Sequence, residues 1–464
     1  MALEAGGVRP GGRASVSCGA ALGGTPVSLR DDRAIERWYK PLPPLRSRQL
    51  QRDSPMSIRA FGTLYAWGAN HLGQCGRGPG HDQLTPSAVP GLPPVQAVAT
   101  NSAATLALDE RGRVWSWGFD EGALLARPGA SGGSPYWLPS VLRALGHRNT
   151  VPGGNPGDGP APATSSEPTP SPGLCYPPGV VEGLPPVVQI ALGDENGLAL
   201  DHDGRVWAWG RWSCTGRHPE PRSALPPPQA TPLVIEGLPR IRQISIGARA
   251  LVAYALDTEG RVWSWGNGWE GELGRGKRRF DEKPGTVEGL GPVRSVHAGT
   301  NDCLALLEDG RLWGWGSSEV GLGFRAPKRN TLRVLAPVRV DGVEKVVALW
   351  RGSGLAVFRT EDGRTCAMGQ GIGLLDPMQA GQPPDRPLHR AELDACSHFG
   401  IGSDHGFALH GDGQALAFGR VASGALGNGD ADPDALLAPI PIQLRGRPLA
   451  FAAQAHHSYA LMSD

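Results

Sequence analysis

The chain has 464 residues, of which 68 are glycine and 44 are proline, while its hydrophobic fraction of 40% is ordinary for a folded protein. A formal net charge of +1 gives no overall attraction to nucleic acid or to an anionic membrane. No stretch reaches the roughly 18 consecutive apolar residues of a membrane span. We therefore expect a turn-rich all-β protein that binds neither nucleic acid nor membrane.

The first 55 residues differ in composition from the rest of the chain. They are rich in glycine, arginine and proline, carry no repeat, and lack the apolar core of a secretory signal. We expect residues 1–55 to form a flexible N-terminal extension. Because Met56 lies just before the first repeat, a mis-assigned upstream start is the alternative to a genuine tail or a targeting segment.

A pair of glycines six residues apart recurs seven times from Gly62 onward, at a period of about 50 residues. The first glycine of a pair suits a tight hairpin, which needs positive φ, and large side chains alternate along the strand that follows. We interpret the paired tryptophans as packing between stacked sheets. The repeat positions are Gly62, Trp67, Gly68, Gly112, Trp115, Trp117, Gly118, Gly204, Trp207, Trp209, Gly210, Gly260, Trp263, Trp265, Gly266, Gly310, Trp313, Trp315, Gly316, Gly363, Gly369, Gly413 and Gly419.

A second signature, Gly-Leu-Pro, starts at Gly91, Gly183 and Gly237, upstream of the hairpins. With it, each repeat supplies four short strands, which is a propeller blade, and a single blade cannot bury both of its faces. The segment 446–464 lacks the Trp-Gly half of a repeat, and 62–68 lacks the first half. The sequence therefore predicts a seven-bladed β-propeller over residues 56–464, closed by pairing of the N- and C-terminal half-repeats.

One long interruption of the repeat, at about residues 126–178, is rich in proline, glycine, serine and threonine, and we expect a projecting loop there. The seven cysteines are scattered and form no Cys-x-x-Cys, which predicts free thiols in a reducing, cytoplasmic environment. The histidines show no metal-ligand spacing. No nucleophile and base stand together and no phosphate-binding loop occurs in context, so we expect no metal, no cofactor and no enzymatic activity.

The Asp-Gly hairpins and Trp-Gly strands occur together with Gly-x-Leu-Gly at 271–274 and 424–427, and with His-Ser-x-Ala-Leu at 457–461. In this combination the chain, from about Ile58 to Asp464, resembles the regulator-of-chromosome-condensation family of propellers. Two repeats, at 365–369 and 415–419, lack the tryptophans, which predicts thinner packing there. The resemblance implies a rigid ring whose loops do the binding, and the family's founding member is a nucleotide exchange factor for a small GTPase.

We expect a monomeric, non-catalytic scaffold that binds a protein partner through loop residues. The aromatic candidates outside the repeat are Tyr136 and Trp137, beside the interruption, and Trp212 and Trp269, in the turns after Trp-Gly. For each of these residues, packing within its own loop is the competing interpretation. Guanine nucleotide exchange on a small GTPase is the alternative function, and contact with chromatin or DNA is a third that the near-neutral charge disfavours.

Overall fold

The computed structural model describes residues 61–120, 122–127, 175–211, 214–215, 228–247, 251–319, 321–324, 332–376, 387–432 and 436–463. The predicted extension at 1–55 lies outside these residues. So does most of the predicted insertion at 126–178. The described ends of that insertion are Ala126, Arg127 and residues 175–178, which belong to strand β6 (Cys175–Val180).

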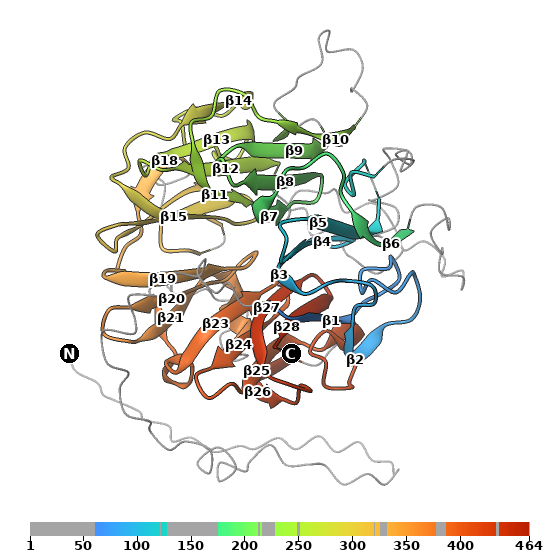
Figure 1. Ribbon diagram of the computed structural model, residues 1–464. Helices are drawn as coiled ribbons and strands as arrows, with labels where there is room; N and C mark the ends of the chain where they lie inside the picture. Colours follow the sequence, from blue (N-terminus) through green and yellow to red (C-terminus); the bar gives the residue numbers. More distant parts are fainter. Residues whose placement is uncertain are drawn as a thin grey trace, which may run out of the picture. The chain divides into compact units, whose positions relative to one another are not determined.

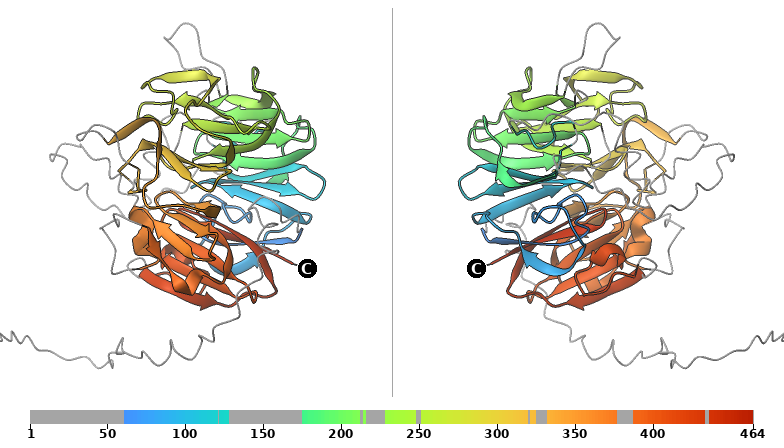
Figure 2. Two further views of the ribbon diagram at one scale, coloured as in Figure 1. Left: turned by 90° about the vertical axis from the view of Figure 1, so that its left-hand side faces the viewer. Right: turned by 90° about the vertical axis from the view of Figure 1, so that its right-hand side faces the viewer.

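The described strands form seven four-stranded antiparallel sheets that follow one another around a closed ring (Figures 1 and 2). This confirms the all-β, seven-bladed propeller. Blade 1 consists of β3 (Val95–Thr100), β4 (Ala104–Asp109), β5 (Val114–Phe119) and β6. Blade 2 consists of β7 (Val187–Leu192), β8 (Asn196–Asp201), β9 (Val206–Gly210) and β10 (Gln229–Val234). Blade 3 consists of β11 (Ile241–Ile246), β12 (Val252–Asp257), β13 (Val262–Asn267) and β14 (Phe280–Thr286).

Blades 4–6 continue the ring, and three short 3-10 helices follow strands β21, β22 and β25. Blade 4 consists of β15 (Val293–Ala298), β16 (Asp302–Leu307), β17 (Leu312–Ser317) and β18 (Arg333–Arg339). Blade 5 consists of β19 (Val346–Arg351), β20 (Ala356–Thr360), β21 (Thr365–Met368) and β22 (Leu388–His389). Blade 6 consists of β23 (Cys396–Ile401), β24 (His405–His410), β25 (Ala415–Arg420) and β26 (Leu436–Ile442). The helices are η3 (Gln370–Leu374), η5 (Ala391–Leu393) and η6 (Ala422–Gly424).

Blade 7 joins the two ends of the propeller. It consists of β27 (Pro448–Gln454), β28 (His457–Met462), β1 (Thr63–Gly68) and β2 (Gln83–Ala88), in the order β2-β1-β28-β27. Strand β1 pairs along its whole length with β28, from Thr63 opposite Met462 to Gly68 opposite His457. The predicted closure by half-repeats is therefore confirmed, and neither half-repeat is left with β1 or β28 as an unpaired edge.

The repeat glycines answer local backbone demands. Gly112 turns the β4–β5 hairpin at a φ of 78°, and a Cβ there would lie 3.0 Å from Val187 N of the next blade. Gly118 has a φ of 99°, and a Cβ would lie 2.4 Å from Ala103 O. Gly62 differs from the prediction, because it opens no hairpin. It pairs with Val95 of blade 1 through Gly62 N–Val95 O, at 3.0 Å, since the strand beside β1 comes from the C-terminal end of the chain.

The second tryptophan of each of the four Trp-x-Trp pairs, and Trp67 at the same position of the Tyr-Ala-Trp strand, join neighbouring blades. Each side chain is fully buried, and each indole Nε1 donates to a backbone carbonyl in the loop of the preceding blade. The five bonds are Trp67–Ala425 O (2.9 Å), Trp117–Gln74 O (2.7 Å), Trp209–Leu124 O (2.7 Å), Trp265–Cys214 O (3.0 Å) and Trp315–Glu272 O (2.7 Å). Each therefore adds a directional bond to the apolar packing of two blades.

Met368 and Phe418 occupy the tryptophan position in blades 5 and 6. The sequence predicts thinner packing there, but both side chains are fully buried in the structure. What these two blades lack is the indole N–H, so their interfaces with the preceding blade rest on apolar contact without that hydrogen bond.

Candidate functional site

The two faces of the ring differ in the length of their connections. The hairpins between the second and third strand of each blade, and the crossings from one blade to the next, lie on one face, which we call the hairpin face. Because strands alternate in direction, the connections after the third strands open on the other face, the loop face. These include the longest ones, such as 120–174 and 211–228. The longest connections, the kind of segment that often carries binding residues on a rigid frame, thus start and end on the loop face.

The hairpin face carries a repeated carboxylate motif that stabilises the turns. In blade 2, Asp201 Oδ1 accepts the backbone N–H of Asp203 (3.0 Å) and of Arg205 (2.8 Å). Its Oδ2 accepts Arg205 Nε (2.8 Å) and Trp207 Nε1 (2.9 Å). Burial raises the pKa of Asp201, but the hydrogen bonds from Trp207 and Arg205 outweigh burial and hold it below its usual range. The same motif occurs at Asp109 and Asp257.

Blade 4 lacks this motif. Leu307 stands where blades 1–3 have the aspartate, and Trp313 Nε1 is buried without a partner among the described residues. In blades 1–3, the two backbone N–H groups, the arginine Nε and the indole N–H of the motif all bond the aspartate and so stabilise the hairpin. We assign this set of residues to the fold rather than to binding.

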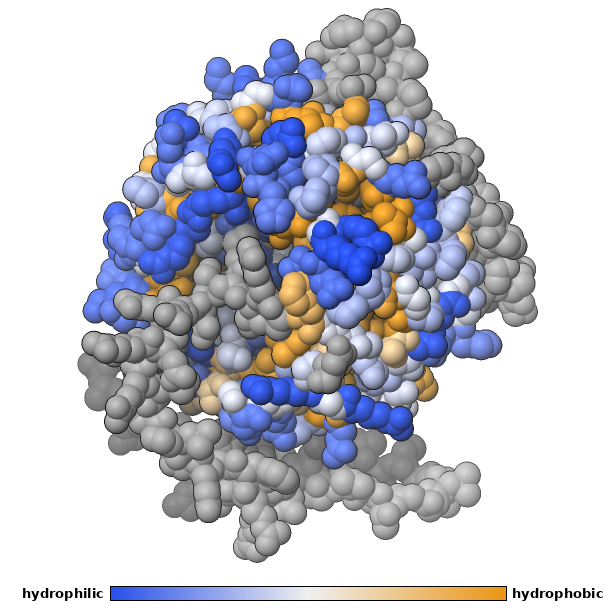
Figure 3. All heavy atoms as spheres, in the orientation of Figure 1, coloured by the Kyte–Doolittle hydropathy of each residue, from blue (hydrophilic) through white to orange (hydrophobic). Residues whose placement is uncertain are grey.

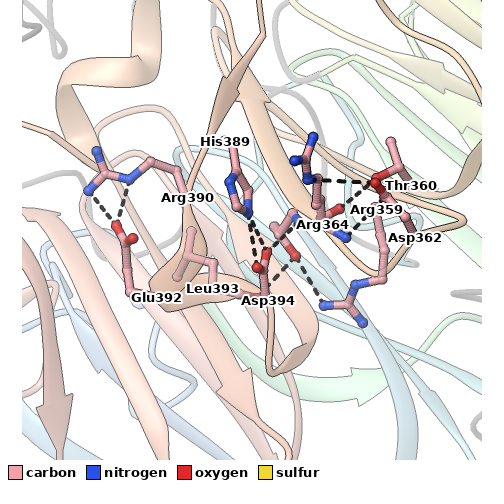
Figure 4. A network of polar contacts seen from close by, with 10 residues as sticks. Arg359, Thr360, Asp362, Arg364, His389, Arg390, Glu392, Leu393 and Asp394 are labelled. Atoms are coloured by element: carbon pink, nitrogen blue, oxygen red, sulfur yellow. Dashed lines mark hydrogen bonds and ion pairs between the residues drawn. The ribbon is translucent and has the colours of Figure 1, made fainter. Parts of the chain in front are cut away.

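A second polar network lies at the hairpin-face end of blade 5 (Figure 4). His389 Nε2 lies 2.9 Å from Asp394 Oδ2, and Asp394 Oδ1 accepts the backbone N–H of Thr365 at 2.6 Å. Cys366 is the cross-strand neighbour of His389, so a thiol, an imidazole and a carboxylate come close together. Burial raises the pKa of the Cys366 thiol, and the charge of Asp394 raises it further, so the sulfur is a protonated, weak nucleophile.

The other buried titratable groups also favour their neutral forms. Burial lowers the pKa of His405 and of His457 to about 3. Their Nε2 atoms bond Ser458 Oγ (2.6 Å) and Thr100 Oγ1 (2.7 Å), which ties blade 7 to its two neighbours. Burial raises the pKa of Cys75 and Cys396 to about 12. Among the described residues, no cluster of three or more His, Cys, Asp or Glu is arranged to hold a metal ion, and no helix is long and apolar enough to cross a membrane.

The loop face of blades 3 and 4 carries the two most exposed large hydrophobic side chains of the described residues. Trp269, in the β13–β14 connection, is 53% exposed, and Leu332, just before β18, is 55% exposed. Their chain neighbours Glu270 and Arg333 form a two-point ion pair, with Arg333 Nε–Glu270 Oε2 at 2.6 Å and Arg333 NH2–Glu270 Oε1 at 3.0 Å. The face drawn in Figure 3 mixes hydrophilic residues with hydrophobic ones, as is usual for the surface of a folded protein.

Of the four aromatic residues proposed from the sequence, the structure describes only Trp269. Tyr136, Trp137 and Trp212 lie outside the described residues. Leu332, Glu270 and Arg333 were not foreseen, because nothing in the local sequence brings positions 269 and 332 together. Only the stacking of blade 3 on blade 4 does.

The sequence model of the RCC1-like domain matches residues 63–460, so the chain belongs to the family of RCC1-like propellers. It is 26% identical over 408 residues to the guanine nucleotide exchange factor SRM1 of Saccharomyces cerevisiae, with 80% of each chain covered. It is 28% identical over 373 residues to the human E3 ubiquitin-protein ligase HERC2, with 74% of this chain but 7% of that protein covered. The solved structure of Prp20p from Saccharomyces cerevisiae superposes with a TM-score of 0.66 at 21% identity, covering 90% of this chain and 96% of that one.

Proposed function

We propose that this RCC1-like propeller is a non-catalytic scaffold that binds a protein partner on its loop face. The observation that carries the proposal is the presence of two exposed apolar side chains, Trp269 and Leu332, on neighbouring blades at the point where the Glu270–Arg333 ion pair joins their chain segments. Exposed aromatic residues on an ordered frame are typical anchors of protein interfaces. Burial keeps the thiols described above protonated and the buried histidines neutral, so none of these groups is poised as a base or nucleophile.

The test is site-specific photocrosslinking of the full chain in host cells. A crosslinker replaces Glu319, in the β17–β18 connection of blade 4, or Arg111, in the hairpin of blade 1. We expect a discrete crosslinked protein from position 319 and none from position 111, because both side chains are exposed but only the first lies on the loop face, close to Arg333. Crosslinks that arise only from position 111, or from neither position, would overturn the proposal.

Guanine nucleotide exchange on a small GTPase is the second candidate. It is favoured by the similarity to the exchange factor SRM1, which extends over 80% of both chains and so over the propeller as a whole. An exchange factor stabilises the nucleotide-free state of its partner, so it accelerates release of bound GDP. Incubating the purified chain with host small GTPases that carry fluorescent GDP would support this function if release becomes faster, and unchanged release rates throughout would exclude it for those GTPases.

We further propose that the protein is a monomer in a reducing compartment, in agreement with the cytoplasmic location predicted from the sequence. Five of the described cysteines, at positions 75, 175, 303, 366 and 396, are free thiols. Such thiols persist where glutathione and thioredoxin keep them reduced. Fractionation of host cells, with size-exclusion chromatography of the cytoplasmic fraction, tests both proposals.

A further inference from the structure

Trp269 and Leu332 belong to different blades, but their chain segments are joined across the blade boundary. We call Trp269, Glu270, Leu332 and Arg333 the blade 3–4 patch. The ion pair links the residue after Trp269 to the residue after Leu332, which holds the two segments together on the loop face. Two large apolar side chains that are more than half exposed on joined segments offer apolar surface that a partner can bury.

The backbone under the patch is fixed by hydrogen bonds. Trp269 N donates to Asn267 Oδ1 at 3.1 Å, and Glu270 N donates to the buried Glu272 Oε2 at 2.7 Å. On the other side, Leu332 O accepts Ser318 N at 2.7 Å and Ser318 Oγ at 3.0 Å. A partner that docks here therefore meets a preformed surface, and little ordering entropy is lost on binding.

Exposed cations lie beside the patch. Lys277, Arg278 and Arg279 are exposed in the same β13–β14 connection, and Arg278 Nε donates to Trp269 O at 2.6 Å. Arg279 shares the carboxylate of Asp281 with Arg275. Arg278, in contrast, forms no ion pair with a carboxylate among the described residues, whereas the nearby carboxylates of Glu270, Glu319 and Glu272 act on Arg333.

We infer that the blade 3–4 patch binds an extended acidic segment of a protein partner, with one large apolar side chain seated between Trp269 and Leu332. Carboxylates on either side of that side chain would pair with Arg278 and Lys277. This inference rests on the proposed binding function and specifies the chemistry of its partner. A nucleic acid fits less well, because two exposed apolar groups call for an apolar counterpart and the chain as a whole carries a charge of only +1.

The probe is a phage-displayed library of random dodecapeptides, selected on the full chain. We expect the selected peptides to carry net negative charge and at least one Leu, Ile, Phe, Met or Trp. Trp269→Ala and Arg278→Glu should each weaken binding of these peptides by about tenfold or more, as for a buried interface anchor. The affinity for the intact chain should fall as salt rises.

The matched control is Val188→Ser, which removes an exposed apolar side chain from β7 of blade 2 and should leave peptide affinity unchanged. Equal thermal unfolding midpoints for all variants show that the ring is intact. Selected peptides without acidic residues, or peptides that bind Trp269→Ala as tightly as the intact chain, would overturn the inference. So would tighter binding of a single-stranded 20-nucleotide oligothymidine than of any peptide, if Trp269→Ala abolishes it.

The crosslink from position 319 separates this inference from the proposed function. A partner that is crosslinked there equally well with Trp269 intact and in Trp269→Ala keeps the scaffold function but rejects the patch. Loss of the crosslink in Trp269→Ala supports both. A chain with Trp269 intact that crosslinks no partner from position 319 rejects the scaffold function itself.

Discussion

A double-mutant cycle at the interface of blades 3 and 4 tests how the indole bonds hold the ring together. Glu272 O accepts two hydrogen bonds, from Trp315 Nε1 of blade 4 at 2.7 Å and from Tyr254 OH of its own blade at 2.6 Å. Trp315→Phe or Tyr254→Phe removes one donor and leaves the other. The double variant leaves a buried carbonyl with neither side-chain donor.

A single hydrogen bond contributes about 1 kcal/mol net, whereas an orphaned buried polar group costs about 1–3 kcal/mol. Each single variant should therefore lose about 1 kcal/mol for its bond, and Trp315→Phe should lose more for the smaller ring. The double variant should lose about 1–2 kcal/mol beyond the sum of the two singles.

The free energy of unfolding is measured by urea denaturation, followed by circular dichroism and by tryptophan fluorescence. The fluorescence survives each substitution because the chain has 14 tryptophans. Equal slopes with denaturant for all four proteins are the control that the same structure unfolds in each. Strictly additive losses, or a double variant that is more stable than the sum predicts, would refute the idea that the shared carbonyl governs this interface.

Three further predictions follow from the same structure. Burial raises the pKa of Glu272 to about 7, so the folded state holds a proton that the unfolded state releases near pH 4.5, and stability should fall as pH rises from 4.5 to 7. Glu272→Gln should remove most of that pH dependence, so at pH 8 its free energy of unfolding should exceed that of the native chain by on the order of 3 kcal/mol. Urea titrations of both proteins at pH 5 and pH 8 measure this difference. The same change in stability between the two pH values for both proteins would contradict it. Ala123 and Ala126 hold φ values of 60° and 48°, so glycine at either position should raise the free energy of unfolding by about 0.5–1 kcal/mol, and a lower thermal midpoint would argue against backbone strain there. Deleting residues 446–464 removes both C-terminal strands of blade 7 and should leave insoluble protein or no cooperative transition, whereas a native-like transition would show that the ring does not need its closure.

The blade count and the ring closure could be predicted because both depend on the spacing of residues that are close together in the sequence. The glycine that turns each hairpin and the glycine behind each second tryptophan occupy positions that only glycine tolerates, such as Gly112 and Gly118. The unpaired half-repeats at the two ends then leave one arrangement that closes the ring. The carboxylate motif is also visible in the sequence, because Asp109, Asp201 and Asp257 each precede the first tryptophan of their repeat by six residues.

The candidate site was predicted only in part, because it depends on contacts between blades. Trp269 could be singled out as an aromatic residue outside the repeat, but Leu332 is one of many leucines, and Glu270 meets Arg333 at a separation of 63 residues. Which side chains gather across a blade boundary depends on how each loop folds back, and no periodicity encodes that. The replacements at Met368 and Phe418 illustrate the same limit, since the sequence shows the missing indoles but not how fully the substitutes are buried.

Blade 7 also sets the order in which the protein can be made. Strand β1 is among the first parts of the propeller to leave the ribosome, yet its partner β28 is almost the last. Until β28 is made, β1 exposes an unpaired strand edge, and the pairing that closes the ring has a very large sequence separation, which slows folding. Blades 1–6 can form one after another on the growing chain, but the seventh cannot. The ring is therefore completed only by its last strand, and the wait for that strand is the stage at which the nascent propeller depends most on protection from aggregation.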